Sequence, residues 1–142
     1  MKLTDSVALI TGAGRGIGAT CAQMLAADGA RVFVNDLDAD ACAETVERIR
    51  ASGGDAQGMA LDITADGAAE QLIDQVIAVF GGLDIIVNNA GYVWNSAMHK
   101  HSDEQWQAML DMHATAPFRI LRAYYPWLKD TVAREQTAGV VR

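Results

Sequence analysis

Short apolar runs alternate with segments of helical periodicity along most of this sequence. The runs cover residues 7–10, 31–35, 56–61 and 83–87, and their length is typical of buried strands. In the segment 64–80, apolar residues recur at the three- and four-residue spacing of a helix. Strands that alternate with helices form a parallel sheet with helices on both faces. The pattern therefore predicts an α/β fold with a doubly wound parallel sheet.

Capping residues and glycines predict where the helices begin and end. Asp38 precedes a helix of about residues 39–51, and Thr64 precedes one that runs to Phe80. Short polar side chains at these positions accept hydrogen bonds from the first free N–H groups of a helix. A glycine pair follows Phe80, and glycine commonly ends a helix.

The last long predicted helix covers residues 102–130. It opens on Ser102, with Gln105 three residues later, which resembles a capping box. Pro117 lies inside this helix, and because proline has no N–H, the carbonyl of His113 loses its helical donor at an expected kink. We expect a homo-oligomer to form through this helix.

Composition narrows the class of protein. The 142 residues match one domain, and no apolar stretch approaches the length of about 20 residues that spans a bilayer. The net charge of −7 disfavours nucleic acid and anionic membrane surfaces as partners. The first apolar run is too short for a secretion signal, so a cytoplasmic location is expected. Cys21 and Cys42 lack metal-like spacing, and we expect no metal site.

A glycine-rich loop follows the first predicted strand. Its glycines are Gly12, Gly14, Gly16 and Gly18. Glycine lets the backbone turn sharply and approach a ligand, while the first N–H groups of the following helix are free to bind an anion. The spacing is Gly-x3-Gly-x-Gly, and Ile17 stands where the more common Gly-x-Gly-x-x-Gly pattern has its last glycine. The loop favours a dinucleotide pyrophosphate, and a turn that serves only strand–helix packing is the alternative.

Asp36 stands at the carboxyl end of the second predicted strand, 18 residues after Gly18. A carboxylate there accepts hydrogen bonds from ribose hydroxyls and repels a 2′-phosphate, so Asp36 favours NAD over NADP. Asp38 is the better helix cap, which leaves Asp36 for a ligand. Arg15 favours NADP instead, because a guanidinium pairs with phosphate, although a solvated arginine is equally ordinary there. We expect NAD, with NADP as the less favoured cofactor.

Four motifs follow one another in an order and spacing that identify a family resemblance. They are residues 11–18, Asp36, Asp62 and residues 88–91. Together they resemble the short-chain dehydrogenase/reductase family, most closely its branch of acyl-carrier-protein-reductase-like enzymes. The resemblance implies a Rossmann-type sheet of strand order 3-2-1-4. It covers essentially the whole chain, as the amino-terminal half of such an enzyme.

The same resemblance implies a single NAD(P)-binding domain over residues 1–142 that is incomplete at its carboxyl end. Residues 139–142 look like the first residues of the family's fifth strand. The sheet is therefore expected to be truncated before that strand.

The resemblance also implies which residues bind the cofactor. They are Gly12, Gly14, Arg15, Gly16, Ile17, Gly18, Asp36, Asp62, Ile63, Asn88, Ala90 and Gly91. By similarity, Asp62 and Ile63 line the adenine pocket, and Asn88 both borders the nicotinamide ribose and ties neighbouring strands together. Two alternatives stay open, because an asparagine pair after a strand is common in turns and Asp62 can cap a turn.

The family's catalytic Ser, Tyr and Lys come after the stretch represented here, and the last two form a Tyr-x3-Lys pair on a helix beyond the fifth strand. The Tyr protonates the developing alkoxide with its pKa lowered by the nearby Lys, so this chain alone is expected to be inactive. Tyr125 and Lys129 match the spacing, but they precede the fifth strand, and Pro126 removes a helical hydrogen bond directly after the tyrosine. We expect a packing or subunit-contact role for this pair.

His113 stands where the family usually has an asparagine whose backbone carbonyl holds a water in a proton relay. That role needs only the backbone, so the carbonyl of His113 is the candidate catalytic group in this chain. The alternative is a core histidine that is hydrogen-bonded within the helix layer.

The resemblance implies hydride transfer between NAD(H) and the hydroxyl or carbonyl carbon of a small-molecule alcohol or ketone in the intact protein. One alternative is a non-catalytic NAD-binding module. Another is an S-adenosylmethionine-dependent methyltransferase, which has a similar glycine loop and acidic residue. Thr11 before the loop and the motif of residues 88–91 disfavour the methyltransferase.

Overall fold

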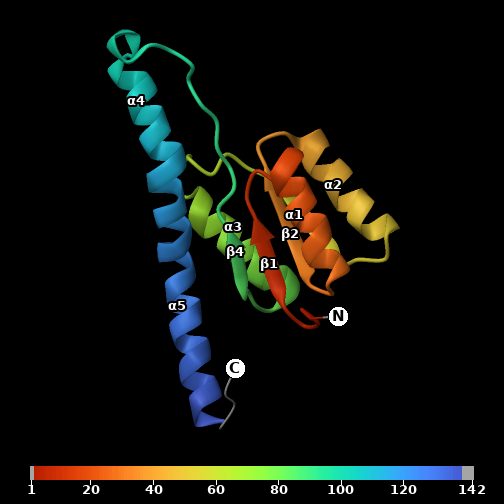
Figure 1. Cartoon of the computed structure of the whole chain (residues 1–142). Helices are drawn as coiled ribbons and strands as arrows, with labels where there is room; N and C mark the ends of the chain where they lie inside the picture. The colour runs from red at the N-terminus through yellow and green to blue at the C-terminus, as the bar shows by residue number, and fades with distance from the viewer. Residues whose placement is uncertain (1, 139–142) are drawn as a thin grey trace.

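The structure, a computed structural model, describes residues 2–138 and forms a four-stranded sheet flanked by helices (Figure 1). The strands are β1 (Val7–Ile10), β2 (Arg31–Asp36), β3 (Ala56–Ala60) and β4 (Ile85–Val87). The helices are α1 (Gly16–Ala27), α2 (Ala39–Ala51), α3 (Ala68–Phe80), α4 (Asp103–Leu110) and α5 (Ala116–Thr137). A 3-10 turn, η1 (Met98–Lys100), precedes α4, and a π-helical turn, η2 (Asp111–Thr115), joins α4 to α5.

The strands are parallel, and their order β3-β2-β1-β4 confirms the predicted Rossmann-type topology. β1 lies between β2 and β4, with Ala8 opposite both Val32 and Ile85. Because the carboxyl ends of parallel strands share one edge, the loops after β1, β2 and β4 meet there. The predicted start of a fifth strand, residues 139–142, lies outside the described residues.

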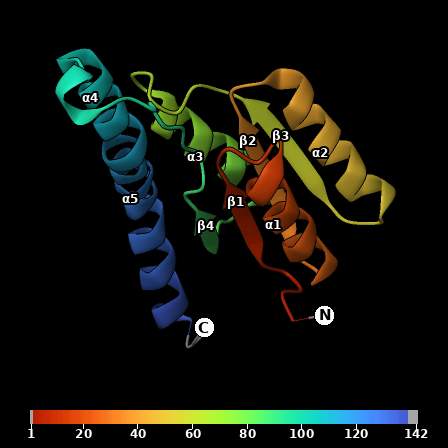
Figure 2. The ribbon, with the colours of Figure 1, turned by 45° about the horizontal axis from the view of Figure 1, so that its top comes forward.

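Alternate residues of β1 pack into two separate cores. Val7 and Leu9 belong to the cluster that contains Leu72 of α3 and Ile120 of α5. Ala8 and Ile10 belong to an alanine-rich cluster with residues of α1 and α2. Figures 1 and 2 show the same division, with α1 and α2 on one face of the sheet and α3 and α5 on the other. The strand is therefore buried on both sides, as its uninterrupted apolar sequence predicts.

The helix predicted from residue 64 begins instead at Ala68, after Gly67 with φ of +76°. Thr64 donates its N–H and its hydroxyl to Asp62 Oδ1, at 2.9 and 2.6 Å. The prediction of Thr64 as a helix cap is therefore wrong, because Asp62 holds it in a preceding turn. The other end of the helix is confirmed, since Gly81 with φ of +77° ends α3.

Strand β4 is shorter than the predicted strand 83–87. The N–H of Val7 donates to Asp84 Oδ2 at 2.8 Å, and the N–H of Asp84 donates to the Val7 carbonyl at 2.9 Å. A side-chain oxygen thus accepts the bond at this end of the ladder, and regular pairing begins opposite Ala8 at Ile85. β3 likewise ends at Ala60, one residue before its predicted end.

The predicted capping box at the start of α4 is confirmed. Ser102 Oγ accepts the N–H of Gln105 at 3.2 Å, and Gln105 Oε1 accepts the N–H of Ser102 at 3.1 Å. The two reciprocal bonds satisfy N–H groups at the amino end of the helix.

The kink expected at Pro117 takes the form of a π turn inside one long helix (Figure 1). The N–H of Ala116 donates to the carbonyl of Asp111, a five-residue spacing in place of the usual four. The helix continues past residue 130 to Thr137 with Pro126 inside it. The predicted end near residue 130 is therefore too early.

Candidate functional site

The loops at the carboxyl edge of the sheet border an open cleft of about 430 Å³. The predicted cofactor-binding residues in its lining are Gly12, Arg15, Ile17, Gly18, Asp36, Asp62, Ile63, Ala90 and Gly91. Gly14, Gly16 and Asn88 are not in this lining. Residues that sequence reasoning did not propose also line it, namely Asn35, Leu37, Leu61, Asn89, Tyr92 and Met112.

The glycine loop needs glycine for two separate reasons. Gly12 and Gly16 have φ of +61° and +57°, a region in which side chains are strained. A Cβ on Gly12 would also lie 2.6 Å from Ala90 Cα, so the loop could not pack on the segment after β4. At Gly16 a Cβ would meet nothing within 4 Å, so only the backbone angle requires glycine there. The loop is thus both bent and closely packed.

The amino end of α1 has no side-chain cap within the described part of the chain. Arg15 is its N-cap residue, and its side chain makes no capping hydrogen bond. The first turn of α1 contains no acidic residue either. Free N–H groups and the positive end of the helix dipole at this position suit an anion.

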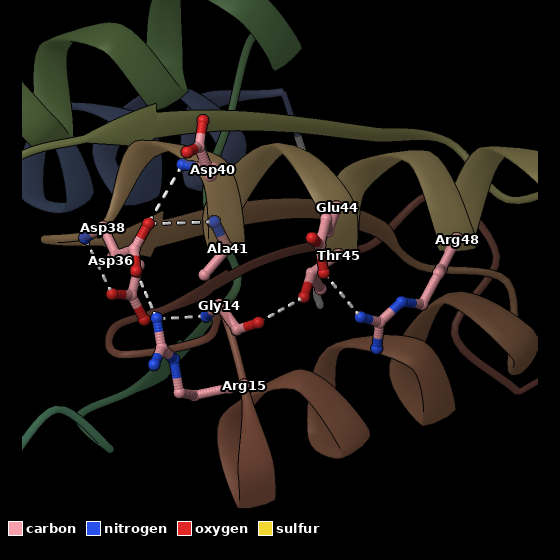
Figure 3. Close-up of polar contacts among 9 residues, drawn as sticks. All are labelled: Gly14, Arg15, Asp36, Asp38, Asp40, Ala41, Glu44, Thr45 and Arg48. Carbon is pink, nitrogen blue, oxygen red and sulfur yellow. Dashed lines mark hydrogen bonds and ion pairs between the residues drawn. The ribbon is translucent and has the colours of Figure 1, made fainter.

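Gly14 fixes Asp36 rather than lining the cleft (Figure 3). Its N–H donates to Asp36 Oδ2 at 2.8 Å, and its carbonyl accepts the buried Thr45 hydroxyl at 2.9 Å. Asp36 Oδ1 accepts the N–H of Asp38 at 3.0 Å. Both carboxylate oxygens are thereby anchored by backbone groups, and each retains acceptor capacity for a further hydrogen bond.

Asp38 caps α2, as predicted. Its Oδ1 accepts the N–H groups of Asp40 and Ala41, each at 3.1 Å. Its Oδ2 pairs with the guanidinium of Arg15, which reaches across from the glycine loop. The hydrogen bond from Ala41 lowers the pKa of the Asp38 carboxyl, and the charge of Arg15 acts in the same direction.

Thr11 and Asn89 hold the glycine loop to the segment after β4. Thr11 is 1% exposed, and its hydroxyl oxygen accepts the N–H groups of Asn89 and Ala90 at 3.2 and 3.1 Å. Asn89 Nδ2 donates to the carbonyls of Thr11 and Gly12, both at 3.0 Å. The resemblance implied that Asn88 ties neighbouring strands together. In the structure Asn88 is exposed, and the bonds between the glycine loop and the segment after β4 are made by Asn89. A pair of adjacent asparagines gave no signal to choose between them.

Asp62 and Ile63 lie between β3 and α3. Asp62 accepts both hydrogen bonds of the turn at Thr64, which confirms the alternative that it caps a turn. Asp62 also lines the cleft, so it remains one of the candidate site residues. Ile63 is 4% exposed and packs in the core beneath α3 and α5. Ile63 therefore borders the cleft from a largely buried position.

His113 lies in the π turn and contacts the segment after β4. Its Nε2 is 2.8 Å from the Tyr92 carbonyl, and a Cβ on Gly91 would lie 2.6 Å from His113 Cε1. The residue is exposed, so the alternative of a core histidine is wrong. The imidazole instead contacts the segment after β4 at Gly91 and Tyr92, beside the cleft.

Tyr125 and Lys129 lie away from the cleft, near the middle of α5. Tyr125 is 62% exposed and borders a surface depression that also includes Lys129 and Val132. Its neighbour Tyr124 packs against the sheet instead, where its hydroxyl donates to the Leu83 carbonyl at 2.5 Å. The structure gives the Tyr-x3-Lys spacing no place at the candidate site.

Two further observations concern metal ligands and membrane-spanning helices. Over residues 2–138, no cluster of His, Cys, Asp and Glu side chains has the geometry to hold a metal ion. Within the same residues, no helix combines the length and the apolar character needed to cross a membrane.

The fold and the edge of the sheet described above are those of a Rossmann-like α/β protein. The sequence model of the short chain dehydrogenase family matches residues 6–141. The chain belongs to the short-chain dehydrogenase/reductase family, which confirms the resemblance.

Named relatives and solved structures match most of this chain. A rhamnolipids biosynthesis 3-oxoacyl-(acyl-carrier-protein) reductase of Pseudomonas aeruginosa is 35% identical over 140 residues, which are 99% of this chain and 54% of the reductase. A short chain dehydrogenase from Mycobacterium avium has a TM-score of 0.88 at 32% identity over 99% of this chain and 50% of its own.

A metagenomic short-chain oxidoreductase in complex with NADP has a TM-score of 0.84 at 35% identity, covering 89% of this chain and 57% of its own. The chain thus spans about half the length of the relatives that it matches.

Proposed function

We propose that this chain binds the dinucleotide of an NAD(P)-dependent oxidoreductase. When bound, the reduced cofactor would supply a hydride to the carbonyl carbon of a small-molecule ketone, and the oxidised cofactor would accept one from the hydroxyl carbon of an alcohol. The observation that carries this proposal is the single cleft that gathers the glycine loop, Asp36 and Ala90 from the ends of three strands. Residues 1–142 would form a single NAD(P)-binding domain in the cytoplasm.

The residues of the cleft fit a dinucleotide part by part. The uncapped amino end of α1, next to Gly12 and Ile17, suits the pyrophosphate, since free N–H groups there have an anion as their natural partner. The anchored carboxylate of Asp36 suits the hydroxyls of the adenosine ribose. Ile63 and Asp62 suit the adenine, and Ala90 and its neighbours after β4 suit the other end of the cofactor.

We propose NAD as the preferred cofactor. Asp36 is held in place by the N–H groups of Gly14 and Asp38. Its charge cannot rotate away from a 2′-phosphate without breaking both bonds, so an NADP ligand would meet repulsion there. Arg15, the residue that would favour NADP, is paired with Asp38.

We also propose that the carbonyl of His113 contributes to the reaction in the intact protein. A π turn interrupts the regular hydrogen-bond pattern of a helix, and such turns are frequent at functional sites. His113 lies in this turn beside the cleft-lining residues Gly91 and Tyr92. The imidazole of His113 contacts the Tyr92 carbonyl. We therefore assign the role in the reaction to the backbone carbonyl of His113.

We propose that two copies of the chain associate through the helix of residues 102–130. Exposed apolar side chains recur at three- and four-residue spacing along α5, which continues this helix to Thr137; they form a stripe of Phe118, Leu121, Tyr125, Leu128 and Val132. Side chains at that spacing lie on one face of a helix. A second copy offers the same stripe, and pairing the two removes both from water.

The cofactor proposal is tested by titrating the chain with NADH, NADPH and S-adenosylmethionine in a calorimeter. We expect NADH to bind most tightly, and Asp36→Ala to weaken it at least about tenfold, because the ribose loses a charged hydrogen-bond acceptor. Asp40→Ala is the matched control, since it removes an equal charge whose carboxylate lies outside the cleft. Tightest binding of S-adenosylmethionine would contradict the proposal.

A further inference from the structure

Arg15, the basic residue of the glycine loop, is held by a carboxylate from another element (Figure 3). Its Nη2 contacts Asp38 Oδ2, and the two side chains are 70% and 48% exposed. The other oxygen of Asp38 accepts the N–H groups of Asp40 and Ala41. One carboxylate therefore joins the start of α2 to the loop that opens α1.

Asp36 lies next to this ion pair. Its Oδ1 accepts the N–H of Asp38, and its Oδ2 accepts the N–H of Gly14 beside Arg15. Asp36 and Arg15 line the cleft, whereas Asp38 is outside the lining. Two carboxylates and one guanidinium thus stand at the end of β2, and the net charge of this group is negative.

The ion pair changes what Arg15 can do. An arginine binds a phosphate best when its fork of N–H donors is free to make two parallel bonds. In this chain at least one terminal nitrogen of the fork already serves Asp38. A phosphate placed beside Asp36 would have to compete with that carboxylate for Arg15, and it would also meet the charge of Asp38 itself.

We propose that Asp38 is a specificity-determining positioning residue that disfavours a 2′-phosphorylated dinucleotide by occupying Arg15. This inference rests on the dinucleotide site proposed above. Asp38 lies outside the lining of the cleft, so it would act through Arg15. Without its charge, Arg15 is free to pair with a 2′-phosphate, and the chain accepts NADPH more readily.

The cap and the ion pair can be separated by one substitution. Asparagine keeps an oxygen that accepts the N–H groups of Asp40 and Ala41, and it is as good a cap as aspartate. Asp38→Asn therefore removes the charge and keeps the start of α2. Asp38→Ser is a second variant that caps a helix without a charge.

The test is a fluorescence titration of the full chain with NADH and with NADPH. The proteins are the unmodified chain, Asp38→Asn, Arg15→Gln and the double variant, each checked for helix content by circular dichroism. We expect Asp38→Asn to raise the NADPH affinity relative to NADH by about tenfold at low salt, and less at high salt, because exposed charges are screened. Arg15→Gln in the same chain should remove most of that gain.

The outcomes separate the inference from the proposal on which it rests. If the unmodified chain binds NADH but neither Asp38→Asn nor Asp38→Ser changes the ratio of the two affinities, the inference is overturned and the dinucleotide site stands. A gain that survives Arg15→Gln overturns the inference as well, since the ion pair is then not its cause. If the unmodified chain and all variants bind neither cofactor, the proposed function fails together with the inference.

Discussion

The chain around the ends of β1 and β2 and the chain that follows β4 lie at the same edge of the sheet but are built in different ways. Thr11, Ala13, Gly14 and Asn35 are buried, and side-chain hydrogen bonds hold the loop to its neighbours. Residues 91–100, in contrast, are all exposed. They include Trp94 and Met98, which are 47% and 91% exposed.

The difference shows which part of the cleft is shaped by this chain's own packing. The glycine loop and Asp36 are fixed before any ligand arrives, so binding there costs little ordering. The loop after β4 is braced by His113 at Tyr92, and its apolar side chains beyond that point face water. Such a segment gains its final shape from whatever covers it. The following substitutions test this contrast.

The largest effect is expected from Gly12→Ala. The added Cβ would lie 2.6 Å from Ala90 Cα, at a φ of +61°. Because the backbone angle is strained and the two loops are forced apart, the free energy of unfolding should fall by at least about 3 kcal/mol, as urea denaturation would measure.

Gly53→Ala is the matched control, since φ there is +84° and a Cβ would meet nothing within 4 Å. Strain alone should cost it roughly 1–2 kcal/mol. Equal losses in the two variants would show that the glycine loop is not closely packed on the segment after β4.

Thr11→Val should have the next largest effect. It removes the oxygen that accepts the N–H groups of Asn89 and Ala90, and it puts an apolar group of similar size in its place. Unpaired groups at a buried site lower the free energy of unfolding by about 1–3 kcal/mol. Thr11→Ser keeps the hydroxyl and should recover most of the loss, so a serine variant as unstable as the valine one would argue against the hydrogen bonds.

Leu121→Glu tests the exposed side of the comparison. Leu121 is 52% exposed on the apolar stripe, so a charge there should change the folding of one copy by less than about 0.5 kcal/mol. It should nevertheless abolish association, as sedimentation velocity would measure. Met24→Glu, at a 66% exposed position of α1, is the control that leaves association intact. Association that survives Leu121→Glu would place the interface elsewhere.

The smallest effect concerns the pH dependence of the α2 cap. The pKa of Asp38 is lowered from 3.8 in the folded chain, so its cap stabilises the fold above that value and the stabilisation is lost as the pH falls through the folded pKa. The difference in unfolding free energy between the unmodified chain and Asp38→Asn should therefore shrink below about pH 3.8. A difference that stays constant down to pH 2 would contradict this.

Local patterns predicted most of the fold. The strands followed from uninterrupted apolar runs, the start of α2 from Asp38, and the strand order from the family resemblance. The beginning of α3 was misplaced because Asp62 accepts the N–H and the hydroxyl of Thr64 in a turn before the helix, and a capping pattern does not reveal that turn.

The candidate site was predicted less completely, since its details depend on contacts between distant residues. The glycine loop and Asp36 have a recognisable spacing, and the structure brings them together. Asn89 was missed because only the geometry after β4 tells it from Asn88. The pairing of Arg15 with Asp38 could not be read from the sequence either, because the two residues are 23 positions apart.

The central claim is that the glycine loop and the end of β2 hold a dinucleotide. It is tested most directly by NMR titration of the ¹⁵N-labelled chain with NAD, which reports each backbone N–H separately. We expect the largest shift changes at Gly12, Ile17 and Gly18 of the loop and at Asp36, with none along the exposed stripe of α5. Changes confined to α5 or to residues 91–100, or no change at saturating NAD, would contradict it.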